Sequence, residues 1–200
     1  MTEEAMARAK AAFETEAREV RRAGEVMDMQ AFSQAVDALK NAPRIGASGC
    51  GHSGIACRHF AHLMCCIERP ARFISPSEAV HGATGFLQKG DVMVLVSRGG
   101  KTAELLPIAK ISRAKGVLVI SLTEALDSPL AALSDIVLPM KVEHETDRYN
   151  CQGTSSFLCT NAIFDALQAA LIEETGFQNE QFAVIHPGGA VGERLNADKQ

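Results

Sequence analysis

Apolar and polar positions alternate in blocks along the chain, and one block organises the others. Residues 92–96 are five apolar residues in a row, three of them valine, which is typical of a strand buried on both faces of a parallel sheet. The chain then turns polar over residues 97–104, and apolar residues recur at helical spacing from Leu105 to Ile111. The pattern therefore predicts a strand, a tight polar turn and a helix.

A polar turn that leads into a helix favours anion binding, because the first N–H groups of the helix lack partners and the helix dipole is positive there. Ser97 and Thr102 add hydroxyl donors, while Gly99 and Gly100 let an anion approach the backbone. We interpret the turn as a phosphate cradle. The alternative is an ordinary strand-to-helix turn in which Thr102 only caps the helix.

Other apolar runs predict four more strands, at residues 43–47, 71–75, 117–122 and 136–140. Helical periodicity and capping residues separate these runs. The longer helices are expected at residues 3–24, after Asp28, after Gly54, after Thr102 and at 154–174, and a short helix is expected at 177–184. Strands that alternate with helices indicate a doubly wound parallel α/β sheet.

Three of these helices have apolar faces that need a partner. The first stripe consists of Met6, Ala9, Phe13, Ala17 and Val20, and the second of Met29, Phe32, Val36 and Leu39. The helix at 154–174 is apolar nearly all round. These faces predict packing on the sheet or against another subunit.

A second glycine-rich turn follows the first predicted strand, at Ser48-Gly49-Cys50-Gly51-His52-Ser53-Gly54. Its spacing differs from the G-x-G-x-x-G of dinucleotide sites and from the nucleotide P-loop. On its own the turn is weak evidence of binding. Turns at the carboxyl ends of parallel strands meet at one crevice, however, so two such turns together predict a ligand site.

Several polar residues outside the two turns are candidates for chemistry. His81 follows a short helical turn at residues 76–78, and His186 precedes the glycine-rich segment 187–192, which we expect to be a loop. Each is either a site residue or a structural histidine. His144, Glu145 and Asp147 come just after a predicted strand, where α/β enzymes often place catalytic groups. We do not favour a metal there, because adjacent residues on an extended segment splay apart, and we expect His59 and His62 to serve packing or the surface.

Composition narrows the class of protein. The 200 residues are 46% hydrophobic, which suits one domain with a full core, and the net charge is −4 without a basic run. Nucleic acid is therefore an unexpected partner. We predict neither a membrane span nor a secretory signal, because apolar runs are short and the N-terminus is charged. Six cysteines without a disulfide framework indicate reduced thiols in a cytoplasmic protein.

The motifs together resemble the sugar isomerase (SIS) domain family, and in particular its arabinose-5-phosphate isomerases. The resemblance rests on the two turns, on Glu78-Ala79-x-His81-Gly82 and on His186-Pro187-Gly188-Gly189-Ala190-x-Gly192. It implies a three-layer αβα sandwich around a five-stranded parallel sheet. Residues 1–200 are then expected to be a single SIS domain, with N-terminal helices at about 3–40 and a core at about 43–196. The longer members add a paired CBS module, which these residues do not include.

The resemblance also implies roles for individual residues. Ser53, Ser97 and Thr102 would hold a sugar phosphate with the neighbouring amides, and Glu145, His186 and His81 would act in acid–base chemistry. The expected binding set is Ser48, Gly51, Ser53, Ser97, Gly99, Gly100, Thr102, Thr154 and Ser155, although Thr154 and Ser155 would otherwise only cap their helix. Three positions depart from the family pattern: His52 replaces lysine, Lys101 replaces glutamate and Gly99 replaces serine. We keep His52 and Lys101 as catalytic candidates.

These expectations define a function. The chain is expected to interconvert an aldose phosphate and a ketose phosphate through an enediol(ate), without a cofactor or metal, and to prefer a sugar other than arabinose 5-phosphate because two site charges have changed. It is expected to form a homodimer or homotetramer. The alternative is a catalytically silent protein that binds or senses phosphosugars.

Overall fold

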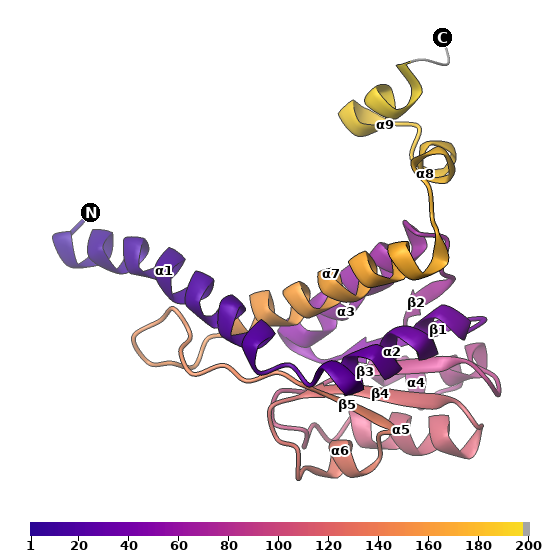
Figure 1. Cartoon of the computed structure of the whole chain (residues 1–200). Helices are drawn as coiled ribbons and strands as arrows, with labels where there is room; N and C mark the ends of the chain where they lie inside the picture. The colour runs from indigo at the N-terminus through magenta and orange to yellow at the C-terminus, as the bar shows by residue number, and fades with distance from the viewer. Residues whose placement is uncertain (198–200) are drawn as a thin grey trace.

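The computed structural model describes residues 1–197 and is built on a five-stranded parallel sheet (Figure 1). The strand order is β2-β1-β3-β4-β5, with every neighbouring pair parallel. The strands are β1 (Ile45–Gly49), β2 (Ala71–Phe73), β3 (Val92–Val96), β4 (Leu118–Thr123) and β5 (Ile136–Pro139). The order reverses between β1 and β3, so a crevice is expected at the carboxyl ends of these two strands.

Helices cover both faces of the sheet and confirm the predicted three-layer fold (Figure 1). One face packs against α2 (Met29–Asn41), α3 (Gly51–Cys65) and α7 (Ser155–Thr175), whose apolar side chains join those of the strands in the larger core cluster. The smaller cluster lies on the other face. Its helices are α4 (Pro76–Ala79), the 3-10 helix η1 (Ala83–Phe86), α5 (Leu105–Ala114) and α6 (Pro129–Ala132).

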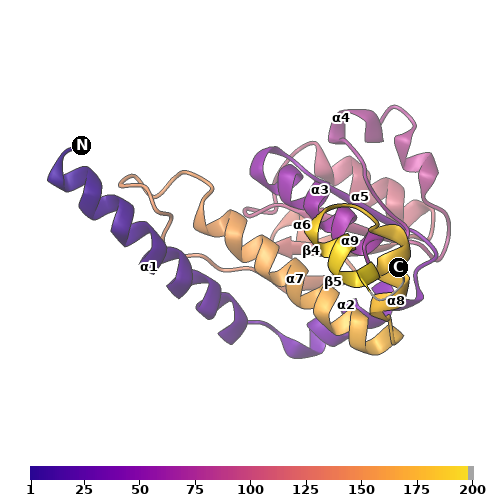
Figure 2. The same ribbon diagram turned by 90° about the horizontal axis from the view of Figure 1, so that it is seen from above.

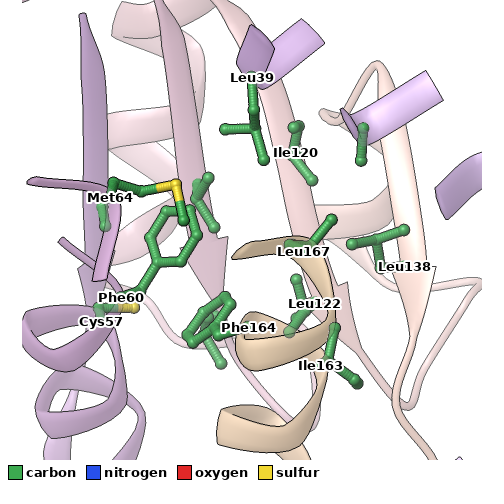
Figure 3. Packing of buried hydrophobic residues seen from close by; sticks show 14 of the residues in the cluster. Leu39, Cys57, Phe60, Met64, Ile120, Leu122, Leu138, Ile163, Phe164 and Leu167 are labelled. Carbon is green, nitrogen blue, oxygen red and sulfur yellow. The ribbon is translucent and has the colours of Figure 1, made fainter. Parts of the chain in front are cut away.

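The larger cluster is centred where α3 and α7 lie over the sheet (Figure 3). The Phe60 and Phe164 rings are 4.4 Å apart between centroids, and neither residue is exposed. Leu122 and Leu138 contribute from the strands. Composition alone would allow α7 to cross a membrane, but it lies against α1, α2 and α3, as the core helix of a folded domain does.

The two ends of the chain extend away from this body (Figures 1 and 2). Helix α1 (Glu3–Glu25) lies along α7 only with its later turns, so Ala23 is buried whereas Phe13 is 75% exposed. At the other end, α8 (Asn179–Ile185) and α9 (Gly189–Asn196) project beyond the C-terminal end of α7. The second predicted stripe packs on the sheet through α2, whereas most of the first stripe is left exposed within residues 1–197.

The structure corrects several details of the sequence prediction. The first strand is shifted two residues later than expected, to Ile45–Gly49, and the second ends at Phe73, before Pro76. The loop expected after His186 is instead helical over Gly189–Asn196. Glycine has a low helix propensity, and the expected loop at residues 187–192 contains three glycines. The sequence pattern therefore did not predict this helix.

Candidate functional site at the carboxyl edge of the sheet

The turn after β3 carries both hydroxyls expected in the cradle. Ser97 Oγ and Thr102 Oγ1 are 2.8 Å apart and share a hydrogen bond. Gly100 adopts a φ of +61°, and a β-carbon there would meet Ser128 Oγ at 1.9 Å, so glycine is required for the turn to close. The helix α5 begins only at Leu105, and its N-cap is Glu104 rather than Thr102. Thr102 is therefore not the simple helix cap considered as the alternative.

Backbone amides in this turn remain available. Within residues 1–197, the N–H groups of residues 101–104 donate to no other backbone or side-chain group, whereas Gly100 N–H donates to Ser97 O at 3.0 Å. These amides precede the first turn of α5, so the helix dipole adds to their positive potential. The turn thus offers the donors that an anion needs.

The turn after β1 is unusually compact. A β-carbon at Gly54 would lie 2.6 Å from Gly49 O, so the first turn of α3 can approach the strand end only because both positions are glycine. Gly51 is exposed and Ser53 half-buried at the start of the helix. Ser48 is fully buried, and its hydroxyl has no hydrogen-bond partner in the part of the chain that the structure describes.

A cavity of about 500 Å³ opens beside the two turns. It extends from the carboxyl ends of β1 and β2 to the start of α5, and its walls combine hydroxyls, one carboxylate and one guanidinium with apolar side chains. Arg58 lies over the Phe73 ring, with its Cζ atom 3.9 Å from the ring centroid. The lining residues are Gly49, Cys50, Gly51, Gly54, Ile55, Arg58, Phe73, Ser75, Pro76, Ser77 and Glu104.

Most of these lining residues were not predicted from the sequence. Cys50 and Glu104 sit within the two predicted turns, in which the serines and glycines are the stronger sequence signal of an anion site. Burial, followed by the nearby Glu104 carboxylate, raises the pKa of the Cys50 thiol. Cys50 is therefore a neutral thiol at pH 7, and all six cysteines are free, as expected.

Glu145 lies at the same edge of the sheet but is enclosed. Its side chain is 0% exposed, and its Oε1 atom accepts a hydrogen bond from Arg98 Nη1 at 2.7 Å. Its Oε2 atom accepts from the backbone N–H groups of Thr154 at 2.9 Å and Ser156 at 3.2 Å, and from the Thr154 hydroxyl at 3.1 Å. The carboxylate thus stabilises the N-terminus of α7.

Arg98, at the carboxyl edge of the sheet, was not predicted as a site residue from the sequence. Its Nε atom donates to Glu124 Oε2 at 2.8 Å, and its Nη2 atom donates to Val142 O at 3.1 Å. Together with Glu145, these contacts join the segments that follow β3, β4 and β5. An arginine directly after one strand, with a glutamate after each of the next two, was a usable signal, because parallel strands bring such positions to one edge.

The other residues of the 141–153 segment point elsewhere. His144 Nδ1 lies 3.4 Å from Glu19 Oε1 on α1, and Glu19 Oε2 also accepts from Glu143 N–H at 3.0 Å. Backbone hydrogen bonds, that from Gln152 foremost, hold the pKa of Asp147 below its usual value. The expected splaying of this cluster is thus observed, and residues 1–197 contain no group of side chains arranged to hold a metal ion.

The two charge-swapped candidates do not share a cavity. His52 Nδ1 is 2.5 Å from Gly153 O, and the ring meets Phe157 edge-on in a separate cavity of about 380 Å³ between α1, α3 and α7. Thr154 lines that second cavity, whereas the buried Ser155 hydroxyl has no partner within residues 1–197. Lys101 is exposed and lines neither cavity.

The remaining histidines are spread over the molecule. His81 is exposed just after α4. His186 ends α8, beyond the end of α7 that is remote from Glu145, and its ring lies 5.0 Å from that of Phe182. His186 is not among the residues that line the 500 Å³ cavity of its own chain, and α8 projects away from the sheet (Figure 1). His59 lies on the surface 3.7 Å from Asp165, and His62 contacts Cys66, in line with their expected packing roles.

Comparison with known proteins decides the family. The SIS domain model matches residues 38–170. The chain belongs to the SIS domain family. Arabinose 5-phosphate isomerase KdsD of Pseudomonas aeruginosa is 38% identical over 152 residues, which are 76% of this chain and 47% of the relative. The chain thus spans about half the length of the curated relatives that it matches.

Two solved structures extend the likeness to SIS domains. A Listeria monocytogenes protein provisionally assigned as a sugar-phosphate isomerase has a TM-score of 0.90 at 38% identity, covering 94% of this chain and 100% of its own. A protein of E. coli CFT073, in complex with A5P, has a TM-score of 0.86 at 27% identity, with the same coverage of both chains. The observed sheet order and layers are therefore those of a SIS domain.

The Arg98 contacts give a stability prediction. Replacing Arg98 with methionine leaves the buried Glu145 carboxylate without its guanidinium, so we expect the free energy of unfolding to fall by about 3 kcal/mol. That value is the low end for breaking a buried ion pair, because the Arg98 side chain is 37% exposed. Urea denaturation of the variant measures the change.

The matched control is Arg8→Met on the exposed part of α1, where we expect no change beyond about 0.5 kcal/mol. If Arg98→Met were as stable as this control, the ion pair would not be what holds the three segments together.

Proposed function

We propose that this chain is an aldose–ketose isomerase acting on a sugar phosphate. One observation carries the proposal: the turn after β3 presents the Ser97–Thr102 hydroxyl pair and the available amides of residues 101–104, and its last residue, Glu104, lines the 500 Å³ cavity. The names of the relatives, arabinose 5-phosphate isomerases, support it.

The phosphate would bind at the turn after β3. Amide N–H groups and the α5 dipole favour a dianion, and the hydroxyls of Ser97 and Thr102 supply two further donors. The sugar would then extend into the 500 Å³ cavity towards Ser75 and Arg58. Such a cavity is large enough for a pentose or hexose.

The proposed chemistry needs one proton to move between C1 and C2 through a cis-enediol(ate). A base takes the proton from carbon, a donor stabilises the developing oxyanion, and an acid or base moves the hydroxyl proton. Glu145, His81, His186, His52 and Lys101 remain the sequence-based candidates. For Glu145 the role stays a prediction, since its two oxygens already accept four hydrogen bonds.

The substrate is proposed at the level of a class. Arabinose 5-phosphate is the first compound to test, because the relatives carry its name. The expectation of a different sugar rested on His52 and Lys101 facing one ligand; His52 lines the smaller cavity, whereas Lys101 lines neither cavity. We propose that the reaction takes place in the cytoplasm without a cofactor, as the free cysteines and acid–base candidates suggest.

We also propose a homo-oligomer in which the tail completes a neighbouring site. His186 ends α8, a helix that projects from the body (Figure 1), and it does not line the 500 Å³ cavity of its own chain. Val184 is 74% exposed beside it, and Phe13 on α1 is 75% exposed. Apolar side chains on two projecting segments are typical of surfaces that pack against another subunit.

The first test compares conversion of phosphorylated and unphosphorylated pentoses, hexoses and tetroses. We expect only phosphorylated sugars to be isomerised. Ser97→Ala removes a charge-assisted hydrogen bond worth about 1.5–3 kcal/mol, so we expect the Kd for the best substrate to rise roughly 10- to 150-fold. Calorimetric titration measures the Kd.

Thr175→Ala at the far end of α7 is the matched hydroxyl control and should bind as tightly as wild type. Unchanged affinity in Ser97→Ala would refute the cradle. Tight binding of sugar phosphates without any conversion would favour the silent binding protein instead.

The second test mixes two defective chains. A double variant, Ser97→Ala with Thr102→Ala, lacks the cradle, and His186→Ala lacks the tail histidine. We expect hetero-oligomers of the two to recover turnover that neither chain shows alone, because some sites then combine an intact cradle with an intact tail. A monomer by light scattering at micromolar concentration, or no recovery on mixing, would contradict the shared site.

A further inference from the structure

Two carboxylates at the carboxyl edge of the sheet differ in their environments. The Glu145 side chain is completely buried and faces Arg98 on one oxygen and the start of α7 on the other. To take a proton from a substrate carbon, a base must reach that carbon and have a free lone pair. The Glu145 side chain is 0% exposed, so a substrate carbon could reach it only if the contacts that hold this edge together were disturbed.

Glu104 meets both requirements. It is exposed, and it lines the 500 Å³ cavity beside Cys50. Its carboxylate caps no backbone N–H of α5, and within residues 1–197 it pairs with no cation. Its influence on the Cys50 thiol agrees with a negative charge directed at the cavity.

The position of Glu104 also fits the proposed anchor. It directly follows the available amides of residues 101–103 and lies two residues after the Thr102 hydroxyl. A phosphate held there would leave the sugar beside the Glu104 carboxylate. Arg58, across the same cavity, is stacked on Phe73 and can donate to sugar oxygens.

We infer that Glu104 is the catalytic base that moves the substrate proton between C2 and C1, an inference that rests on the proposed isomerase function. The carboxylate takes the proton from C2 of the aldose. The electron pair of that C–H bond forms the C1=C2 double bond, and the carbonyl pair moves to O1. After the hydroxyl proton passes from O2 to O1, the enediolate collapses to the C2 carbonyl, and C1 takes a proton from the Glu104 carboxyl, which exchanges its proton with solvent while the intermediate is bound. The sum is ketose from aldose, with no oxidant or reductant.

The test compares Glu104→Gln with Glu145→Gln and with the control Glu173→Gln, an exposed residue near the end of α7. We expect Glu104→Gln to lower kcat at least about 100-fold, the low end for a positioned base, while the Kd for the sugar phosphate changes less than about threefold. Glu104→Asp keeps the carboxylate and should recover part of the turnover. The control should match wild type.

A lower kcat with little change in Kd distinguishes a catalytic role of Glu104 from a structural role. A residue that merely stabilised the start of α5 would alter unfolding or binding, and glutamine would then serve about as well as aspartate. Glu145→Gln is expected instead to lower the melting temperature, since it weakens the contacts with Arg98 and α7.

Each failure has its own signature. If wild type isomerises a sugar phosphate and Glu104→Gln keeps wild-type kcat, this inference is wrong and the proposed function stands. If a folded Glu145→Gln alone loses turnover, the base is Glu145. If wild type binds sugar phosphates but converts none, the proposed function and this inference fall together.

Discussion

The contacts of one guanidinium hold the functional edge of this protein together. Arg98 reaches Glu124, Val142 and Glu145, and so joins the chain segments that follow three neighbouring strands. Because Glu145 also accepts hydrogen bonds from the start of α7, the same ion pair fixes the N-terminus of the longest core helix. These contacts fix Arg98 within the turn after β3, so the available amides of that turn are already in place for an anion.

The two carboxylates at this edge, Glu145 and Glu104, differ in their burial. A carboxylate that is enclosed and accepts several hydrogen bonds contributes to the fold, whereas one that lines a cavity is open to a ligand. The Glu145 side chain is 0% exposed, whereas Glu104 is exposed and lines the 500 Å³ cavity. On the opposite side of α3, His52 is held by Gly153 O and shapes a second, smaller cavity.

The sequence was sufficient for the parts of the structure that depend on local pattern. The run 92–96 predicted β3 to the residue, and Asp28 predicted the start of α2, because a buried parallel strand and an N-cap leave clear signatures. The partners of Arg98 lie 26 to 47 residues away along the chain, and no periodicity encodes them. For the same reason the burial of Glu145 could not be predicted from the sequence.

The central claim is that this SIS domain moves a proton on a bound sugar phosphate, and solvent exchange tests it most directly. Wild-type protein is incubated with arabinose 5-phosphate, and then with other sugar phosphates, in deuterium oxide, and the recovered sugars are examined by NMR. If this domain isomerises a sugar phosphate, we expect deuterium on the carbon that exchanges, C2 of the aldose or C1 of the ketose, for at least one compound. Sugar phosphates that stabilise the protein yet return without deuterium, or a ketose product that carries none, would contradict it.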